Sequence, residues 1–215
     1  ITHLQIAKFV AKSIRHIPNV GNKSILNAGS AGNNYNIPEG QITHIDIAKD
    51  KISHLKNAVV GSVEQLPFGD SSFDIIICVG SVINYCDPLK VFEEFNRVLK
   101  LGGFILLEFE NSHSFEFIFK SDFNKRAVFV DTYYNGSEEN IWYFSEKFIK
   151  EVFLPDEYAI CFSYRWHIIT GLVYRITKDV NLSAKFSSID LILKYVPFLN
   201  KYCSNTSFLI HKKES

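Results

Sequence analysis

At Ser24–Gly32 a short apolar run is followed directly by a run of small residues, and this pattern limits the folds that the chain can adopt. The stretch reads Ser-Ile-Leu-Asn-Ala-Gly-Ser-Ala-Gly. Gly29 can adopt a positive φ, and its small neighbours let a ligand approach the backbone. Ligands of open α/β sheets bind at the carboxyl ends of strands. We therefore predict a parallel strand at Ile25–Asn27 and a sharp turn under a ligand, with an ordinary turn as the alternative.

Further apolar runs follow in the order of an alternating α/β fold. Ser72–Val79 is continuous and rich in β-branched residues, which is typical of a parallel strand covered on both faces. Other strands are predicted at Ile42–Asp46, Ala58–Val60 and Phe104–Phe109. Asn33–Gly40 has turn chemistry and no helical period, so the usual crossover helix after the first strand is expected to be missing or short.

Two helices are clear from their apolar spacing and end signals. Ile1–Ile17 predicts an amphipathic helix, either packed at the sheet edge or serving as a lid over the ligand. Asp87-Pro88 begins the second helix with a cap residue and a proline at its first position. We expect it to end at Gly102-Gly103, with Glu94 and Arg97 facing water.

The regular alternation stops after Glu110. We predict a hairpin around Asn135-Gly136 and a helix capped by Ser145. The remaining predictions are a short helix at Ile47–Leu55, a helix at Ser114–Phe123, a strand at Tyr158–Trp166, a helix at Asn181–Val196 and a last strand at Thr206–Ile210.

Composition excludes several classes of function. The chain has 215 residues and a formal net charge of zero, so it offers no basic stripe for nucleic acid. Its four cysteines form no C-x-x-C pair, which argues against a metal site and for a reducing, cytoplasmic setting. The longest apolar stretch, Tyr158–Ile176, carries Arg165 and Arg175, which argues against a bilayer span. We expect neither nucleic acid nor membrane as a partner.

Four of these stretches, in this order, resemble the class I S-adenosylmethionine-dependent methyltransferases, in particular the methyltransferase type 11-like domain. They are Ile25–Gly32, Ile45-Asp46, Gly61–Asp74 and Asp87–Phe109. The resemblance covers residues 24 to 110, about half of the chain. It implies a Rossmann-like α/β fold, with a seven-stranded, mostly parallel sheet, an antiparallel last strand, helices on both faces and inserted cap segments.

The resemblance also implies which residues hold the cofactor, S-adenosylmethionine. Asp46 would accept from the ribose hydroxyls, although a helix N-cap is a compatible role for it. Ile47 would lie against the adenine. Around these, the methionine part would meet Asn27, Gly29, Ser30 and Ala31, the adenine edge would meet Ser62 and Val63, and the floor near the sulfonium would be formed by Gly80 and Ser81.

Three positions depart from the family pattern. Asn27 stands where an acidic residue is usual, Ala31 where a glycine is usual, and Ser62 where an aspartate is common. These departures keep open a degenerate fold that acts only in binding or regulation. A nicotinamide-dependent oxidoreductase would share the first turn, but Gly61–Phe68 and Leu99–Gly103 would have no role in it.

We expect a single methyltransferase domain over residues 1–215, with an N-terminal helix (1–23), a cofactor-binding half (24–110) and a substrate-side half with cap insertions (111–215). The reaction would be an in-line methyl transfer to a small-molecule acceptor. Any general base would lie beyond the strand ends, among Asn84, Tyr85, Glu110 and His113, and we take Tyr85 and His113 as the catalytic candidates.

The second half of the chain is rich in aromatic residues, for which two interpretations stand. They form either a core or a cap over an uncharged or aromatic acceptor, built from residues 112–144 and 167–197. The residues concerned are Phe115, Phe117, Phe119, Tyr133, Tyr134, Trp142, Tyr164 and Trp166.

Overall fold

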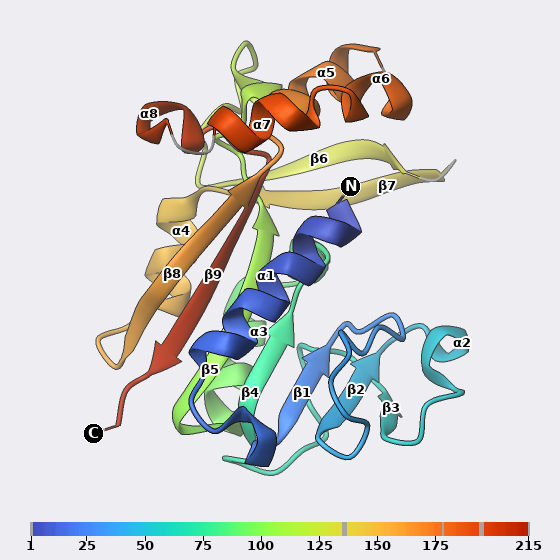
Figure 1. Ribbon diagram of the computed structural model, residues 1–215, viewed down its shortest axis with the longest axis vertical. Helices are drawn as coiled ribbons and strands as arrows, with labels where there is room; N and C mark the ends of the chain where they lie inside the picture. The colour runs from blue at the N-terminus through green and yellow to red at the C-terminus, as the bar shows by residue number, and fades with distance from the viewer. Residues whose placement is uncertain (1, 135–136, 178, 194–195, 215) are drawn as a thin grey trace.

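The computed structural model describes residues 2–134, 137–177, 179–193 and 196–214, and it is built on one seven-stranded sheet (Figure 1). The strand order is β3-β2-β1-β4-β5-β9-β8, and β9 runs antiparallel to both of its neighbours. The expected sheet is therefore confirmed. The strands are β1 (Ile25–Ala28), β2 (Ile42–Asp46), β3 (Ala58–Val60), β4 (Phe73–Cys78), β5 (Leu99–Glu110), β8 (Tyr158–Trp166) and β9 (Asn205–Lys212).

Helices cover both faces of this sheet, and a further layer lies above its carboxyl end (Figure 1). α1 (Thr2–His16) packs on one face, and α3 (Pro88–Val98) and α4 (Glu146–Phe153) pack on the other. The layer above holds the hairpin of β6 (Ala127–Tyr134) and β7 (Ser137–Phe144). Its helices are α5 (Ile169–Thr177), α6 (Val180–Ala184), α7 (Ser187–Leu193) and α8 (Pro197–Asn200). Single turns complete the fold: η1 (Val20–Asn22), α2 (Lys49–Ile52), η2 (Val82–Tyr85) and η3 (Phe115–Phe117).

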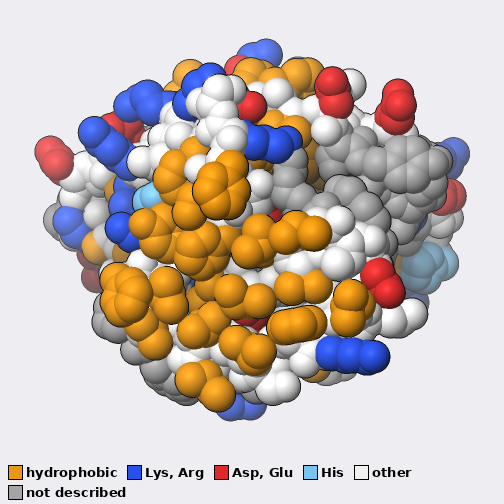
Figure 2. All heavy atoms as spheres, turned by 90° about the horizontal axis from the view of Figure 1, so that it is seen from above, with side chains coloured by type: hydrophobic (Ala, Val, Ile, Leu, Met, Phe, Trp, Pro, Cys, Tyr) orange, Lys and Arg blue, Asp and Glu red, His pale blue; other side chains and the backbone are white. Residues whose placement is uncertain are grey.

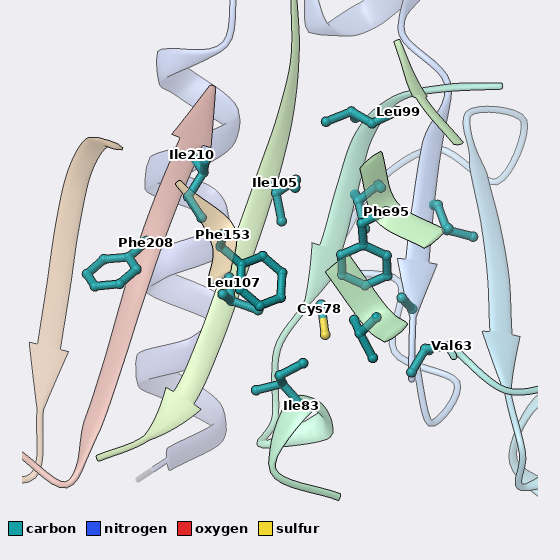
Figure 3. Close-up of a cluster of buried hydrophobic side chains, with 14 of the residues drawn as sticks. Val63, Cys78, Ile83, Phe95, Leu99, Ile105, Leu107, Phe153, Phe208 and Ile210 are labelled. Carbon is teal, nitrogen blue, oxygen red and sulfur yellow. The ribbon is translucent and has the colours of Figure 1, made fainter. Parts of the chain in front are cut away.

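Alternate residues of β4 enter two separate apolar clusters, as a strand buried on both faces requires. Ile75 and Ile77 pack with Phe9 of α1. Ile76 and Cys78 point the other way, into the cluster that contains Phe95 and Phe153. Figure 3 shows this second cluster, with Phe95, Phe153, Leu107 and Cys78 gathered on one side of the strands. The strands that position the site are thus rigidly held.

The N-terminal helix lies over a face of the sheet and not at its edge. Phe9 and Val10 of α1 are fully buried against the sheet. At the beginning of the helix, Thr2 Oγ1 lies 3.0 Å from His167 Nε2, so the helix reaches up to the layer above the strands.

The second helix ends earlier than its sequence suggests. α3 stops at Val98, and Leu99 already pairs with Phe73 as the first residue of β5. Glu94 and Arg97, which were expected to face water, are only partly exposed. Arg97 donates to the carbonyl oxygens of Phe68 (2.6 Å) and Leu66 (2.9 Å) and pairs with Glu94. These bonds anchor the segment that leads into β4.

Three predicted helices are shorter than expected. The helix after Asp46 is only the single turn α2, and Ser114–Phe123 forms only η3. Asn181–Val196 is broken at Lys185 and Phe186 into α6 and α7. The break follows from Asp190, whose carboxylate accepts from the Ile169 amide (2.7 Å) and so turns α7 toward the start of α5. α5 itself was not predicted.

The predicted hairpin and the helix capped by Ser145 are both confirmed. The turn pair Asn135-Gly136 and the side chains of Tyr133 and Tyr134 lie outside the described residues. Phe117 and Trp166 belong to the core, whereas Phe119 is almost fully exposed. Among the described helices, none has the length and apolar character needed to cross a bilayer.

Candidate functional site

The carboxylate of Asp46, at the carboxyl end of β2, binds the turn that follows β1. Gly29 follows β1 with a φ of +71°, and its amide donates to the Ile45 carbonyl (2.8 Å). Asp46 Oδ2 accepts from the Ala31 amide (2.7 Å), and Oδ1 accepts from the Ala48 amide (2.8 Å) just before α2. A carboxylate offers about four acceptor positions, so roughly two remain for a diol. The N-cap residue of α2 is Ala48 and not Asp46, so the expected cap role was wrong; the bond from the Ala48 amide is compatible with ligand binding by Asp46.

The two glycines of the site differ in the space around them. A Cβ on Gly29 would lie 2.4 Å from Val82 Cγ2, so the turn after β1 packs directly against η2. Gly80, after β4, has a φ of +83°, and a Cβ there would meet nothing within 4 Å. Gly29 is thus required by the packing of the protein itself, whereas Gly80 borders open space.

Glu108 of β5 fixes the turn after β4. Its carboxylate is fully buried, and Oε2 accepts from the amides of Gly80 (2.8 Å) and Ser81 (2.6 Å). Oε1 accepts from Asn205 Nδ2 (2.7 Å). Burial raises the pKa of Glu108, and these three hydrogen bonds oppose that rise because they favour the charged form. Glu108 therefore holds the Gly80-Ser81 turn in place, and the role of this turn as the floor of the site stays a prediction.

Sequence reasoning assigned no role to Glu108. The available signal was a single acidic residue that interrupts the apolar run of Phe104–Phe109. An acid in a buried strand requires partners, because an unpaired buried charge is costly. Those partners come from Gly80, Ser81 and Asn205, which are distant in sequence.

Glu110, two residues further on, is half-buried at the carboxyl end of β5. It accepts from Ser81 Oγ (2.9 Å) and from the Tyr143 hydroxyl of β7. Burial raises the pKa of Glu110 to about 7, and the nearby charges of Glu108 and Glu116 add to the rise. A carboxyl group with this pKa can exchange a proton near neutral pH.

The other residues predicted for the methionine part hold the turn after β1. Asn27 is buried, and its Nδ2 donates to the Asn33 carbonyl (2.6 Å). Ser30 is buried, and its Oγ accepts from the Gly32 amide (3.3 Å). Contacts of Asn27, Ser30 and Ala31 with a cofactor stay a prediction.

The residues predicted for the adenine differ in their exposure. Ile47 leaves 78% of its surface exposed, directly after Asp46. Ser62 Oγ accepts from the Glu64 amide (3.1 Å), while the Val63 side chain is buried in the core. Ile47 therefore presents free apolar surface, and Val63 could meet a ligand only through its backbone.

The two catalytic candidates lie in different surroundings. Tyr85 is half exposed on η2, and its hydroxyl donates to Glu139 of β7 (2.6 Å). The His113 ring packs edge-on against Phe123 and Tyr202, with centroids 4.8 Å from each. Burial lowers the pKa of His113. Tyr85 thus borders the hairpin, and His113 sits in an aromatic cluster; their catalytic roles stay predictions.

The hairpin approaches the site through η2. Asn84 is fully buried, and its Nδ2 donates to the Trp142 carbonyl (2.5 Å). Asn84 Oδ1 accepts from the Glu110 amide (3.1 Å). One side chain therefore joins the loop after β4, the end of β5 and the inserted hairpin.

Comparison with known proteins agrees with this arrangement. The methyltransferase domain family matches residues 26–107, which run from β1 to β5. A demethylmenaquinone methyltransferase of Staphylococcus aureus is 36% identical over 78 residues. The alignment covers 32% of this chain, and the chain spans about a third (32%) of the relative's length.

Solved structures resemble the chain over nearly its whole length. One is a crystal structure described as a putative S-adenosylmethionine-dependent methyltransferase from Listeria monocytogenes (TM-score 0.65, 10% identity, covering 99% of this chain and 100% of that one). Another is 1,6-didemethyltoxoflavin-N1-methyltransferase of Burkholderia thailandensis with 1,6-didemethyltoxoflavin and S-adenosylhomocysteine bound (TM-score 0.58, 13% identity, covering 98% of this chain and 79% of that one). At these identities the likeness shows a shared fold. The chain thus carries a match to the methyltransferase domain family over residues 26–107, within a fold that it shares with these structures.

Proposed function

We propose that this protein transfers the methyl group of S-adenosylmethionine to a small, uncharged aromatic acceptor. The observation that carries the proposal is that Gly29, Asp46 and the Gly80-Ser81 turn all lie at the carboxyl ends of neighbouring strands. Asp46 accepts from the Ala31 and Ala48 amides, Glu108 accepts from the Gly80 and Ser81 amides, and the turn at Gly29 packs against Val82. Ligands of parallel sheets bind at this edge. The domain match covers the three strands that carry these residues.

The residues present fit the cofactor. Asp46 keeps free acceptor positions for the ribose hydroxyls, and Ile47 offers exposed apolar surface to the flat adenine ring. Gly80 leaves open space where a larger residue would place a side chain. The departures at Asn27 and Ser62 leave the methionine ammonium and the adenine amine with weaker partners. S-adenosylmethionine, when bound, supplies a methyl group that is already activated by its sulfonium.

Glu110 is the group best placed to take a proton from the acceptor. It stands beside the Gly80-Ser81 turn, and Ser81 Oγ and the Tyr143 hydroxyl orient its carboxylate. A pKa of about 7 leaves a large fraction of it ionised near neutral pH, so it can act as a general base. Tyr85 and His113 stay in the proposal as bordering residues of the acceptor pocket.

The acceptor class rests on the surroundings of Glu110. The hairpin contacts Glu110 through the Tyr143 hydroxyl, and the residues on either side of Tyr143 in β7 are aromatic. Trp142 stacks near Phe144 at 6.4 Å and tilts against Phe129 at 4.9 Å. The relative and the structural neighbour above are named for demethylmenaquinone and for 1,6-didemethyltoxoflavin. Both observations favour a flat ring over a charged or macromolecular substrate.

Calorimetry and a turnover assay with the methyl-labelled cofactor test the proposal together. We expect both S-adenosylmethionine and S-adenosylhomocysteine to bind, a nicotinamide dinucleotide not to bind, and label to pass to a hydroquinone or similar acceptor in a panel. Binding with no labelled product across the panel would favour the degenerate, regulatory alternative. Absence of binding would rule out both.

The variant Glu110→Gln tests whether Glu110 is the general base. We expect turnover to fall by about 10²- to 10⁴-fold, the usual effect of a general base, while S-adenosylhomocysteine binds as before. Glu138→Gln on the exposed hairpin is the matched control and should leave turnover unchanged. Tyr85→Phe and His113→Asn, assayed beside it, identify the base if Glu110→Gln retains full activity.

A further inference from the structure

The helices above the sheet bury small polar residues and expose large apolar ones, the reverse of an ordinary surface helix. In α7, Asp190 faces inward and Ile189 and Ile192 face outward. In α6, Ser183 is buried while Leu182 is exposed. A water-facing helix normally shows the opposite pattern.

The exposed apolar residues form one patch, which we define as Phe119, Ile176, Ile189, Ile192 and Phe198. The exposed fraction of the residue is 97% for Phe119, 73% for Ile176, 69% for Ile192 and 67% for Phe198. Figure 2 shows hydrophobic side chains spread over this upper face of the molecule. Contiguous apolar surface of this kind marks an interaction site.

Three connections hold these elements in one layer. α5 joins α7 through Asp190, which accepts from the Ile169 amide and from Thr170. The segment of Phe119 begins at Phe115, whose amide donates to the Tyr202 carbonyl (3.1 Å), just after α8. Phe115 and Tyr202 also stack at 4.7 Å. The patch residues therefore lie on elements that specific contacts hold together.

The charge of residues 167–204, the helical segment that carries four of the five patch residues, favours an anionic partner. Residues 167–204 carry five lysines or arginines and only two aspartates, whereas the whole chain is neutral. Both aspartates act within the layer, since Asp190 binds the start of α5 and Asp179 caps α6. Lys185 and Lys201 are exposed and, among the described residues, take part in none of the ion pairs. Basic side chains gather along the upper left margin of Figure 2.

We propose that the apolar patch docks this protein on the surface of an anionic lipid bilayer. The large apolar side chains would enter the boundary between headgroups and acyl chains, and the lysines at its margin would pair with lipid phosphates. This contact is peripheral and needs no spanning helix. The inference goes beyond the proposed methyl transfer and does not depend on it, but it would place the site beside a lipid phase from which an apolar acceptor can enter.

Vesicle co-sedimentation tests the inference with the intact chain. The probes are vesicles of phosphatidylcholine alone and vesicles with added phosphatidylglycerol. We expect binding to the anionic vesicles, weakened by salt, and little binding to the neutral ones. The double variant Ile192→Ser with Phe198→Ser should weaken binding by at least about tenfold, since each removes a large apolar side chain from the contact.

Leu101→Ser is the matched control, because Leu101 is also exposed but lies at the amino end of the strands. It should bind vesicles like the unaltered chain. All variants should keep their thermal midpoint and their affinity for S-adenosylhomocysteine, so a lost vesicle interaction cannot be attributed to misfolding or to a failed cofactor site. Equal binding of the double variant, or no binding of the unaltered chain to either vesicle, overturns the inference. The inference is also overturned if the unaltered chain is a dimer without lipid and the double variant is a monomer. That result would show that the patch binds a second copy of this chain.

Discussion

At the scale of single residues, buried or partly buried carboxylates join segments that are far apart in the sequence. Glu108 holds the turn after β4, and Asp74 performs a similar task at the opposite end of the sheet. Asp74 accepts from the Ser24 amide (2.9 Å) before β1 and pairs with Lys100 of β5 (2.8 Å). Burial would raise the pKa of Asp74, but the hydrogen bonds from Lys100 and Ser24 outweigh it and lower the pKa to about 2.

This shift predicts a pH-dependent contribution of Asp74 to stability. The folded-state pKa is depressed, so the contribution is complete above the unfolded pKa and is lost as pH falls from about 4 through about 2. Asp74→Asn should lower the free energy of unfolding by about 2 kcal/mol near neutral pH. Urea unfolding over a pH series measures this. The difference from the unaltered chain should shrink in acid, and a constant difference would contradict the assignment. Asp70→Asn, at an exposed ion pair, should change little.

Gly29 gives a second prediction at this scale. Gly29→Ala should destabilise the fold for two reasons, a positive φ that costs about 1–2 kcal/mol and a collision with Val82. Adding Val82→Ala should relieve the collision, so the double variant should be more stable than the sum of the single effects by about 1 kcal/mol. Gly80→Ala shares the positive φ but has open space, and it measures the strain alone. Additive effects at Gly29 and Val82 would show that the packing contact is unimportant.

At the scale of elements, the hairpin depends on one buried amide. Asn84→Ala would leave the Trp142 carbonyl and the Glu110 amide without this partner, at a cost of about 1–3 kcal/mol. We expect hydrogen exchange to accelerate in β7 while β4 keeps its protection. Asn96→Ala removes a comparable bond, from the Tyr158 hydroxyl of β8 to α3, and should leave exchange in the hairpin unchanged. Unchanged exchange in β7 of the Asn84 variant would show that aromatic packing alone holds the hairpin.

For the whole molecule, we expect cofactor binding to raise the free energy of unfolding. At about a hundred times its dissociation constant, S-adenosylhomocysteine should add about 2.7 kcal/mol, or roughly 5–10 °C in the thermal midpoint. Asp46→Ala should lose most of this rise at the same concentration, because the ribose would lose its acceptor. Scanning fluorimetry measures both. An equal rise in the variant would restrict Asp46 to its observed role of joining the Ala31 and Ala48 amides.

Local patterns in the chain were enough to place most strands and several candidate site residues. The bounds of β2 and β3, the turn at Gly29, the hairpin and the acid at the end of β2 were all predicted, because they depend on periodicity, turn residues and spacing within short segments. The missing crossover helix after β1 was predicted for the same reason.

Contacts between distant segments decided the rest. α3 ends at Val98 because Leu99 pairs with Phe73, and α7 turns because Asp190 reaches the start of α5. Glu108 and Glu110 gain their roles from Gly80, Ser81 and Tyr143, which lie on other elements. Likewise, a helical period reveals which residues share a face of α7, but only packing determines that the polar face lies inside and the apolar face outside. The free energy that decides each of these outcomes comes from contacts with residues that are distant in the sequence.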